Sequence, residues 1–234
     1  GSEMCIRDRD YLKSRGLYEN TLIVFMSDNG PAAEDFYNRG SYVDYVRAHY
    51  DNTYETMGTQ RSFVSYGPQW AEAGSPAFSR HKGYTREGGI SAPFIVTGPQ
   101  LGPRGVRSHT YLTLMDLAPT FLEVARTEYP ADGSVYPLLG ESMLPLLTDG
   151  SPVHDDDYIT TLYHGGRAFI RQGRWKLVTL ERPFDESGFQ LFDVVADPGE
   201  TNDLSEAKPE KRAELIKLWR AERKKLGIIL PGDL

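Results

Sequence analysis

The strongest constraint on the fold is an apolar segment that ends abruptly in a polar turn. Residues 22–26 are five consecutive apolar residues without glycine or proline. The turn that follows consists of Ser27, Asp28, Asn29, Gly30 and Pro31. This pattern predicts a strand that is buried on both faces, as in a parallel sheet covered by helices.

The end of this strand is a candidate cation site. In an open α/β sheet, ligands bind just beyond the carboxyl ends of the strands. Asp28 and Asn29 would offer two hard oxygen ligands to a divalent cation such as Ca²⁺, and Gly30 would let the backbone turn sharply around them. Taken alone, the stretch favours the alternative, an Asx turn that binds nothing.

A glycine-rich block precedes a second apolar run, residues 94–97. The block includes Lys82, Gly83, Tyr84, Thr85, Arg86, Glu87, Gly88 and Gly89. A strand followed by Ser-Asp-Asn-Gly, and then Lys-Gly-x-x-x-Glu-Gly-Gly, resembles the sulfatases of the alkaline-phosphatase superfamily. Further similar blocks follow in family order at residues 115–122, 173–177, 191–194 and 197–200.

The resemblance extends over most of the chain, from about residue 10 to about residue 230, and the spacer residues 49–52 and 65–71 are most similar to the bacterial arylsulfatases of the Pseudomonas type. It implies an arylsulfatase-like sulfuric ester hydrolase that depends on calcium and uses a formylglycine nucleophile. The positions that match Asp28 and Asn29 ligate calcium in this family, and the position that matches Lys82 contacts the sulfate. A cation and an ammonium group suit a substrate whose negative charge must be neutralised.

Two neighbours of these residues have different expected roles. His81 adjoins Lys82 and could approach the same pocket, although the family block does not require histidine there. Glu87 is expected to be structural, because Gly88-Gly89 would adopt an unusual backbone whose amide hydrogens a carboxylate could accept. An isolated lysine such as Lys82 would otherwise be a solvated surface residue.

The remaining chemistry of a sulfatase is not found in these residues. Formylglycine is made from the Cys or Ser of a Cys/Ser-x-Pro-Ser-Arg stretch, which the 234 residues do not contain. Two oxygen ligands also fall short of the six to eight that Ca²⁺ takes. We therefore expect a partial site, and no aryl-sulfate turnover by this chain alone.

Two other functions remain open from the sequence. One is a phosphonate or phosphate ester hydrolase of the same superfamily. The other, for the chain by itself, is a non-catalytic binding or interaction module.

Composition limits the partners. The formal net charge of −7 argues against binding to nucleic acid or to an anionic membrane, and no apolar run approaches the length of a membrane helix. A single cysteine, Cys5, excludes an internal disulfide framework and favours a reducing compartment such as the cytoplasm, with the periplasm left open. His49, His109, His154 and His164 are scattered and are expected to be surface or core residues.

The chain divides into three expected parts. Residues 1–9 are typical of a cloning remnant and a translated adaptor, so we expect a truncated, metagenomic gene product. Residues 10–150 would be the C-terminal part of an α/β catalytic domain with a partial alkaline-phosphatase-like mixed sheet and helices. Residues 151–234 would be a small α+β subdomain.

The small subdomain is expected to consist of a four-stranded antiparallel sheet and a C-terminal helix. Turn signals separate short strands at residues 158–164, 168–171, 175–180 and 190–194. Pro209 suits the first turn of the helix and Gly227 suits its end. Because strand 22–26 would lack neighbours in this chain, we also expect an open apolar edge and self-association through it.

Overall fold

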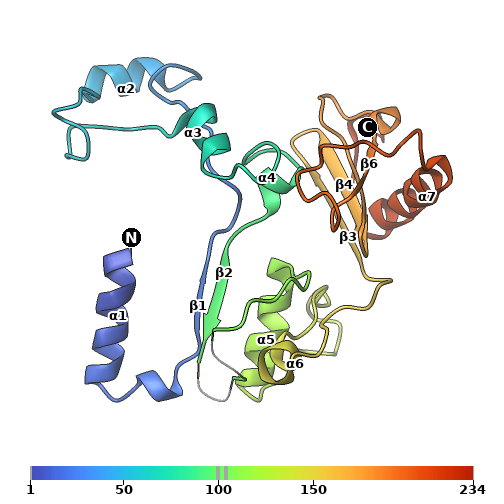
Figure 1. Cartoon of the computed structure of the whole chain (residues 1–234), viewed down its shortest axis with the longest axis horizontal. Helices are drawn as coiled ribbons and strands as arrows, with labels where there is room; N and C mark the ends of the chain where they lie inside the picture. Colours follow the sequence, from blue (N-terminus) through green and yellow to red (C-terminus); the bar gives the residue numbers. More distant parts are fainter. Residues whose placement is uncertain (1, 99–100, 103–104, 234) are drawn as a thin grey trace. The chain divides into compact units, whose positions relative to one another are not determined.

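The computed structural model describes residues 2–98, 101–102 and 105–233, so Gly1 of the expected cloning remnant lies outside the described residues. The chain forms two compact units, each made of two separate segments (Figure 1). One unit combines residues 1–28 with 93–158, and the other combines residues 29–92 with 159–234. The boundary at residue 150 stays a prediction, because the compact units combine segments from both sides of it.

The first unit contains a two-stranded antiparallel ribbon, which Figure 1 shows as two adjacent arrows. Strand β1, Ile23–Met26, pairs with β2, Phe94–Thr97, and Phe25 lies opposite Ile95. Both strands were expected from their apolar runs, but the expectation that the first is buried on both faces in a parallel sheet is wrong. Phe25 is 52% exposed and Ile95 is 60% exposed. An apolar run favours a strand, but burial also needs elements that cover its faces.

The helices of the first unit end and begin where their sequence signals indicate. Helix α1, Ser2–Ser14, ends at Gly16, which has a φ of 67°, and the Leu17 amide donates to the Leu12 carbonyl at 2.9 Å, closing the helix end. A 3₁₀ turn over residues 114–116 leads directly into α5, so Pro119 lies in the first turn of that α-helix. The elements are η1 Tyr18–Asn20, η2 Leu114–Asp116, α5 Leu117–Val124 and α6 Leu144–Asp149.

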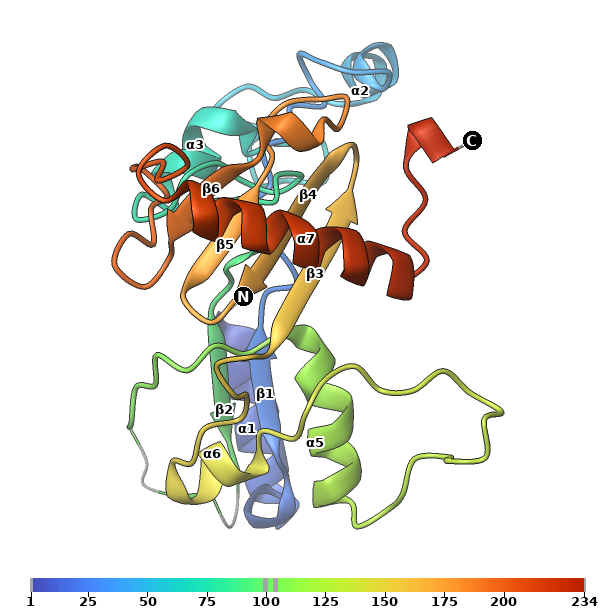
Figure 2. The same ribbon diagram turned by 90° about the vertical axis from the view of Figure 1, so that its right-hand side faces the viewer.

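The second unit contains the four-stranded antiparallel sheet that was expected from the sequence. The strands lie in the order β3-β4-β5-β6. Two-residue turns join β3 to β4 and β4 to β5, and residues 179–189 join β5 to β6. Their bounds are β3 Ile159–His164, β4 Arg167–Gln172, β5 Trp175–Val178 and β6 Gln190–Asp193. Helix α7, Pro209–Lys225, crosses the sheet, as Figure 2 shows.

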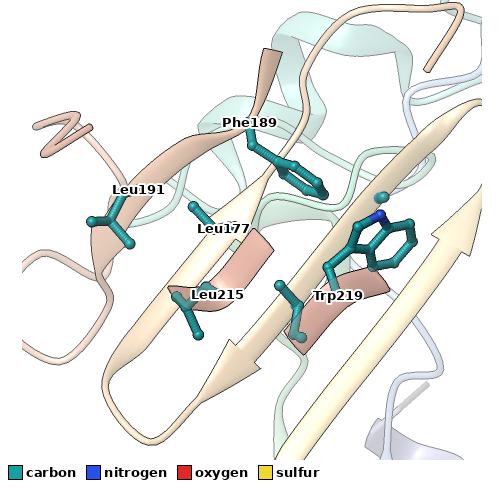
Figure 3. Packing of buried hydrophobic residues seen from close by; sticks show 7 residues of the cluster. Leu177, Phe189, Leu191, Leu215 and Trp219 are labelled. Carbon is teal, nitrogen blue, oxygen red and sulfur yellow. The ribbon is translucent and has the colours of Figure 1, made fainter. Parts of the chain in front are cut away.

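One face of this sheet forms the main core of the unit. Side chains of alternate strand residues pack with Leu215 and Trp219 of α7 (Figure 3). This core comprises Ala168, Ile170, Leu177, Phe189, Leu191, Leu215 and Trp219, all of which are buried. Leu226 follows the last helical residue and is 38% exposed, so it lies outside this core.

The opposite face of the sheet is also buried. Phe169, Val178 and Phe192 alternate with the residues of the first core, and Ile90 of the glycine-rich block packs against them. An antiparallel sheet often has one solvated face. Here α7 covers one face, and residues of the glycine-rich block cover part of the other.

Three short helices lie between the strand-end turn and the second apolar run. They are α2 Val43–His49, α3 Gly67–Ala73 and α4 Glu87–Ile90. The unit also contains η3 Glu186–Gly188 and η4 Pro231–Asp233. Among the described residues, no helix has both the length and the apolar content needed to cross a bilayer.

Candidate functional site

Backbone hydrogen bonds hold the turn after β1 against the glycine-rich block. The Gly30 amide donates to the Gly89 carbonyl at 2.9 Å, and the Lys82 amide donates to the Pro31 carbonyl at 3.0 Å. Asn29 and Lys82 are therefore carried by two segments that are joined directly, although more than fifty residues separate them.

Glycine is required here by close packing. A Cβ atom on Gly30 would lie 1.9 Å from the Gly88 carbonyl oxygen, and one on Gly88 would lie 2.1 Å from the Arg80 carbonyl oxygen. Gly30, Gly88 and Gly89 all lie outside the positive-φ region. The expected bend of the backbone is present at residues 28–30, but the expectation of an unusual backbone at Gly88-Gly89 is wrong, because both residues lie in helix α4. The physical reason for glycine is that two backbones touch.

Lys82 is accessible and pairs with a carboxylate on the adjoining loop. Its Nζ lies 3.3 Å from Glu34 Oε1, with side-chain exposures of 44% and 39%. The pKa of Glu34 is lowered, first by a hydrogen bond that its carboxylate accepts from its own backbone amide and then by Lys82 and the nearby charge of His81, while burial opposes the shift. An ion pair this exposed contributes little stability, so an anion could replace Glu34 as the partner of Lys82 at small cost.

His81 has a defined orientation beside Lys82. Its Nδ1 lies 3.0 Å from the Lys82 carbonyl oxygen, and its ring meets the ring of Tyr84 edge-on at 5.0 Å. Because a carbonyl can only accept, Nδ1 carries the proton and Nε2 is the nitrogen that remains for other contacts.

The two candidate cation ligands fall in different compact units. Asp28, which is exposed, ends the first segment of one unit, and Asn29, which is half-buried, begins the other. The Asn29 side-chain Nδ2 donates to the Gly30 carbonyl at 2.8 Å, which orients the side chain, and Oδ1 is the acceptor atom of its amide. The structure thus describes Asn29, His81 and Lys82 within one unit.

These residues do not fit a complete calcium site. A Ca²⁺ ion takes six to eight oxygen ligands. The described residues contain no group of three or more His, Cys, Asp or Glu side chains that could hold a metal ion. Asp28 and Asn29 could supply two ligands, so no step of a reaction is assigned to a metal here.

A buried charged network fixes the other end of the glycine-rich block. Lys176, on β5, is fully buried, and its Nζ lies 2.7 Å from Glu87 Oε1 and 2.9 Å from Glu200 Oε1. The second oxygen of Glu200 accepts the Glu87 backbone amide at 2.8 Å. Glu87 is structural, as expected, but its carboxylate binds Lys176, whereas the amides of Gly88 and Gly89 donate to backbone carbonyls.

Arg86 extends this network. Its Nη1 donates to the Glu200 carbonyl at 2.7 Å, a second nitrogen donates to Gln190, and its guanidinium lies 4.5 Å from the centre of the Phe192 ring. Burial lowers the pKa of Arg86, and the neighbouring Glu200 carboxylate opposes that effect. Arg86, Lys176, Glu87 and Glu200 therefore attach the block to the sheet through compensated buried charges.

The first unit has its own buried polar cluster around Asp116. Thr113 donates to Asp116 from its amide and its hydroxyl, and the Glu141 amide donates to the other carboxylate oxygen at 3.0 Å. His154 Nε2 lies 3.0 Å from Asp116, and its ring stacks on Tyr158 at 3.7 Å. His154 is thus a core residue, and the exposed acidic residues 155–157 that follow it form no described metal cluster.

The sequence did not predict that Lys176, Glu200 and Asp116 are central to buried networks of polar side chains. Glu200 closes the Asp-Pro-Gly-Glu block and has a φ of 53°, which is uncommon for glutamate. A charged residue between two apolar neighbours, as at Lys176, was the available signal for a buried charge. Neither signal identifies its partner, because the partners are distant in sequence.

Comparison with solved structures identifies the fold. A solved structure described as a 2-O GAG sulfatase matches 93% of this chain with a TM-score of 0.55 and 19% identity, and the chain covers 39% of it. A structure described as bound to its substrate D-glucosamine-2-N,6-O-disulfate matches 93% of this chain with a TM-score of 0.61 and 23% identity, and 37% of it is covered. The α/β fold is therefore that of sulfatase structures.

Sequence matches then identify the family. The sulfatase family model matches residues 9–127, and a model of the C-terminal part of N-sulphoglucosamine sulphohydrolase matches residues 80–225. The chain belongs to the sulfatase family.

Two relatives show how much of a longer protein this chain resembles. An uncharacterized sulfatase of Schizosaccharomyces pombe is 30% identical over 96% of this chain and 41% of its own length. The arylsulfatase of Klebsiella aerogenes is 35% identical over 56% of this chain and 29% of its own length. The chain therefore spans less than half the length of these relatives.

Proposed function

We propose that this chain carries part of the sulfate site of an arylsulfatase-like sulfuric ester hydrolase, similar to the arylsulfatases of the Pseudomonas type. Lys82 would contact the sulfate, and Asp28 and Asn29 would supply two ligands to a calcium ion. The observation that carries the proposal is the pair of backbone hydrogen bonds that join the turn after β1 to the block that presents Lys82.

The chain's own residues would act by binding and orientation. The Lys82 ammonium would exchange Glu34 for a sulfate oxygen and neutralise part of its charge. His81, whose Nδ1 proton is held by the Lys82 carbonyl, would present Nε2 to the same pocket. Formylglycine is the nucleophile of the family, and no step through it is assigned to the residues of this chain.

Binding of an aryl sulfate tests the proposal. We expect Lys82→Ala to weaken the affinity for p-nitrophenyl sulfate, measured by calorimetry or NMR titration, by about tenfold, because a charge-assisted contact is lost. Lys217→Ala is the matched control, because Lys217 is an exposed lysine of the same unit without an ion pair among the described residues.

Two outcomes would contradict the proposal. Equal affinity in Lys82→Ala and the native chain would exclude Lys82 as a sulfate ligand. Tighter binding of phenylphosphonate than of the aryl sulfate would favour the phosphonate or phosphate ester hydrolase instead.

We also propose that the chain self-associates through the β1–β2 ribbon. Phe25 and Ile95 are exposed on paired strands. Among the described residues, neither strand has a neighbour on its outer edge. An open apolar edge favours pairing with a second copy.

A further inference from the structure

Two guanidinium groups lie against one tyrosine ring beside Lys82. Arg167, at the start of β4, has its Cζ 4.0 Å from the centre of the Tyr84 ring, and Arg80 has its Cζ 5.5 Å from the same centre. The His81 ring meets Tyr84 edge-on. Because His81 and Lys82 lie next to each other and both act on Glu34, this cluster adjoins the proposed sulfate contact.

The arginines of this cluster lack a direct carboxylate partner. Arg167 Nε donates to the Leu180 carbonyl at 2.6 Å and Nη1 donates to the Gly83 carbonyl at 3.2 Å, which leaves Nη2 without an acceptor among the described residues. Over the same part of the chain, Arg80 forms no ion pair and the Tyr84 hydroxyl forms no hydrogen bond. One small region therefore holds three donors without a described acceptor, of which Arg80 is exposed, Tyr84 is half-buried and Arg167 is 7% exposed.

Like charges are crowded around Arg167. Burial and then the positive charge of Arg182 lower the pKa of Arg167, Glu181 offsets part of this effect, and Arg80 lowers the pKa further. Most arginines in such a position are compensated by a carboxylate. A bound anion would relieve the repulsion and accept bidentate hydrogen bonds.

The backbone holds Arg80 in an uncommon conformation. Its φ of 71° lies in the left-handed region, and the adjoining turn is pinned by the Gly88 amide, which donates to the Ser79 carbonyl at 2.9 Å. Residues in strained conformations that their surroundings enforce are frequent at ligand sites. The exposed Arg80 side chain is thus placed by buried contacts of its own backbone.

We infer that Arg80, Tyr84 and Arg167 form a second anion subsite, which takes a further sulfate group of a saccharide whose first sulfate binds Lys82. The inference rests on the proposed sulfate site. It assigns to this chain a preference for sugars that carry two sulfates over sugars that carry one. The positive charge and the donors of the cluster set that preference, while the Tyr84 ring holds the two guanidinium groups side by side.

A comparison of two ligands tests the inference. The ligands are glucosamine 6-O-sulfate and glucosamine 2-N,6-O-disulfate, and the readout is the dissociation constant measured with the full chain. We expect Arg80→Asn to weaken binding of the disulfate by about fivefold, as for one partly exposed charge pair, and of the monosulfate by about twofold at most. Asparagine is suited to this variant because it tolerates the left-handed region.

Controls separate this inference from the sulfate site itself. Arg61→Gln removes an exposed arginine of the same unit that has no described side-chain contact, and it should change neither affinity. If Arg80→Asn lowers the affinity for both ligands equally, or lowers neither affinity, the second subsite is contradicted. Lys82→Ala should lower the affinity for both ligands. Unchanged affinities in this variant would contradict the proposed sulfate site.

Discussion

The two sheets of this chain differ in how far their apolar strand residues are buried. In the four-stranded sheet, Ile170, Leu177 and Leu191 are fully buried beneath α7. In the β1–β2 ribbon, the equally apolar Phe25 and Ile95 are more than half exposed. The difference is in the covering elements, because the sheet has a helix on one face and the glycine-rich block against the other. Cover, and not hydrophobicity alone, decides how much a strand stabilises the fold.

The largest expected effect comes from the core beneath α7. We expect Trp219→Ala to lower the free energy of unfolding by about 3–5 kcal/mol, because a fully buried aromatic side chain leaves a cavity. Trp70→Ala is the matched control, since Trp70 is 68% exposed, and it should change stability by no more than about 0.5 kcal/mol. Phe25→Ala should cost about 1 kcal/mol or less. Denaturant unfolding measures all three, and a cost for Phe25→Ala as large as that for Trp219→Ala would show that the ribbon is covered.

Removal of a buried charge on the second face of the sheet should destabilise the protein less than the loss of Trp219. We expect Lys176→Met to destabilise the second unit by about 3 kcal/mol, because it leaves the carboxylates of Glu87 and Glu200 buried without a cation. Lys217→Met, at an exposed position, should be nearly neutral. Adding Glu87→Gln and Glu200→Gln to Lys176→Met should recover part of the loss. If Lys176→Met is as stable as the native chain, the charged network does not hold the glycine-rich block to the sheet.

Substitutions in the β1–β2 ribbon should have the smallest effect on stability. They should instead change self-association. The sedimentation coefficient of the native chain should rise with concentration, and Phe25→Lys should reduce that rise, because a charge on an open strand opposes pairing. Tyr136→Lys is the control, since Tyr136 is 92% exposed and lies outside the strands. A sedimentation coefficient that is independent of concentration would contradict self-association.

The sequence predicted elements whose contacts are local. Two-residue turns separate β3 from β4 and β4 from β5, a loop of residues 179–189 leads to β6, and Pro209 and Gly227 delimit α7, so turn signals and periodicity were sufficient. The burial of β1 was predicted wrongly because it depends on elements that are distant in sequence. The network of Lys176, Glu87 and Glu200 was not predicted for the same reason.

The candidate site was predictable only in part. The segments that carry Asn29 and Lys82 are joined in the structure, but the resemblance, and not any pattern in the residues, suggested that they belong together. The roles of Asp28, Asn29, Lys82 and His81 stay predictions. The close backbone contact at Gly30 and Gly88 could not be derived, because a glycine in the sequence does not reveal what approaches it.

The contact between Glu87 and Glu200 has a consequence for the order in which the protein is made. The two residues are 113 positions apart. At roughly 5–20 residues per second, a ribosome needs about 6–23 s to cover that distance. During this interval the nascent glycine-rich block, with Lys82 already synthesised, has neither the Glu200 carboxylate nor a finished sheet to pack on. The segment that presents the proposed sulfate contact therefore reaches its final form only after residue 200 has left the ribosome.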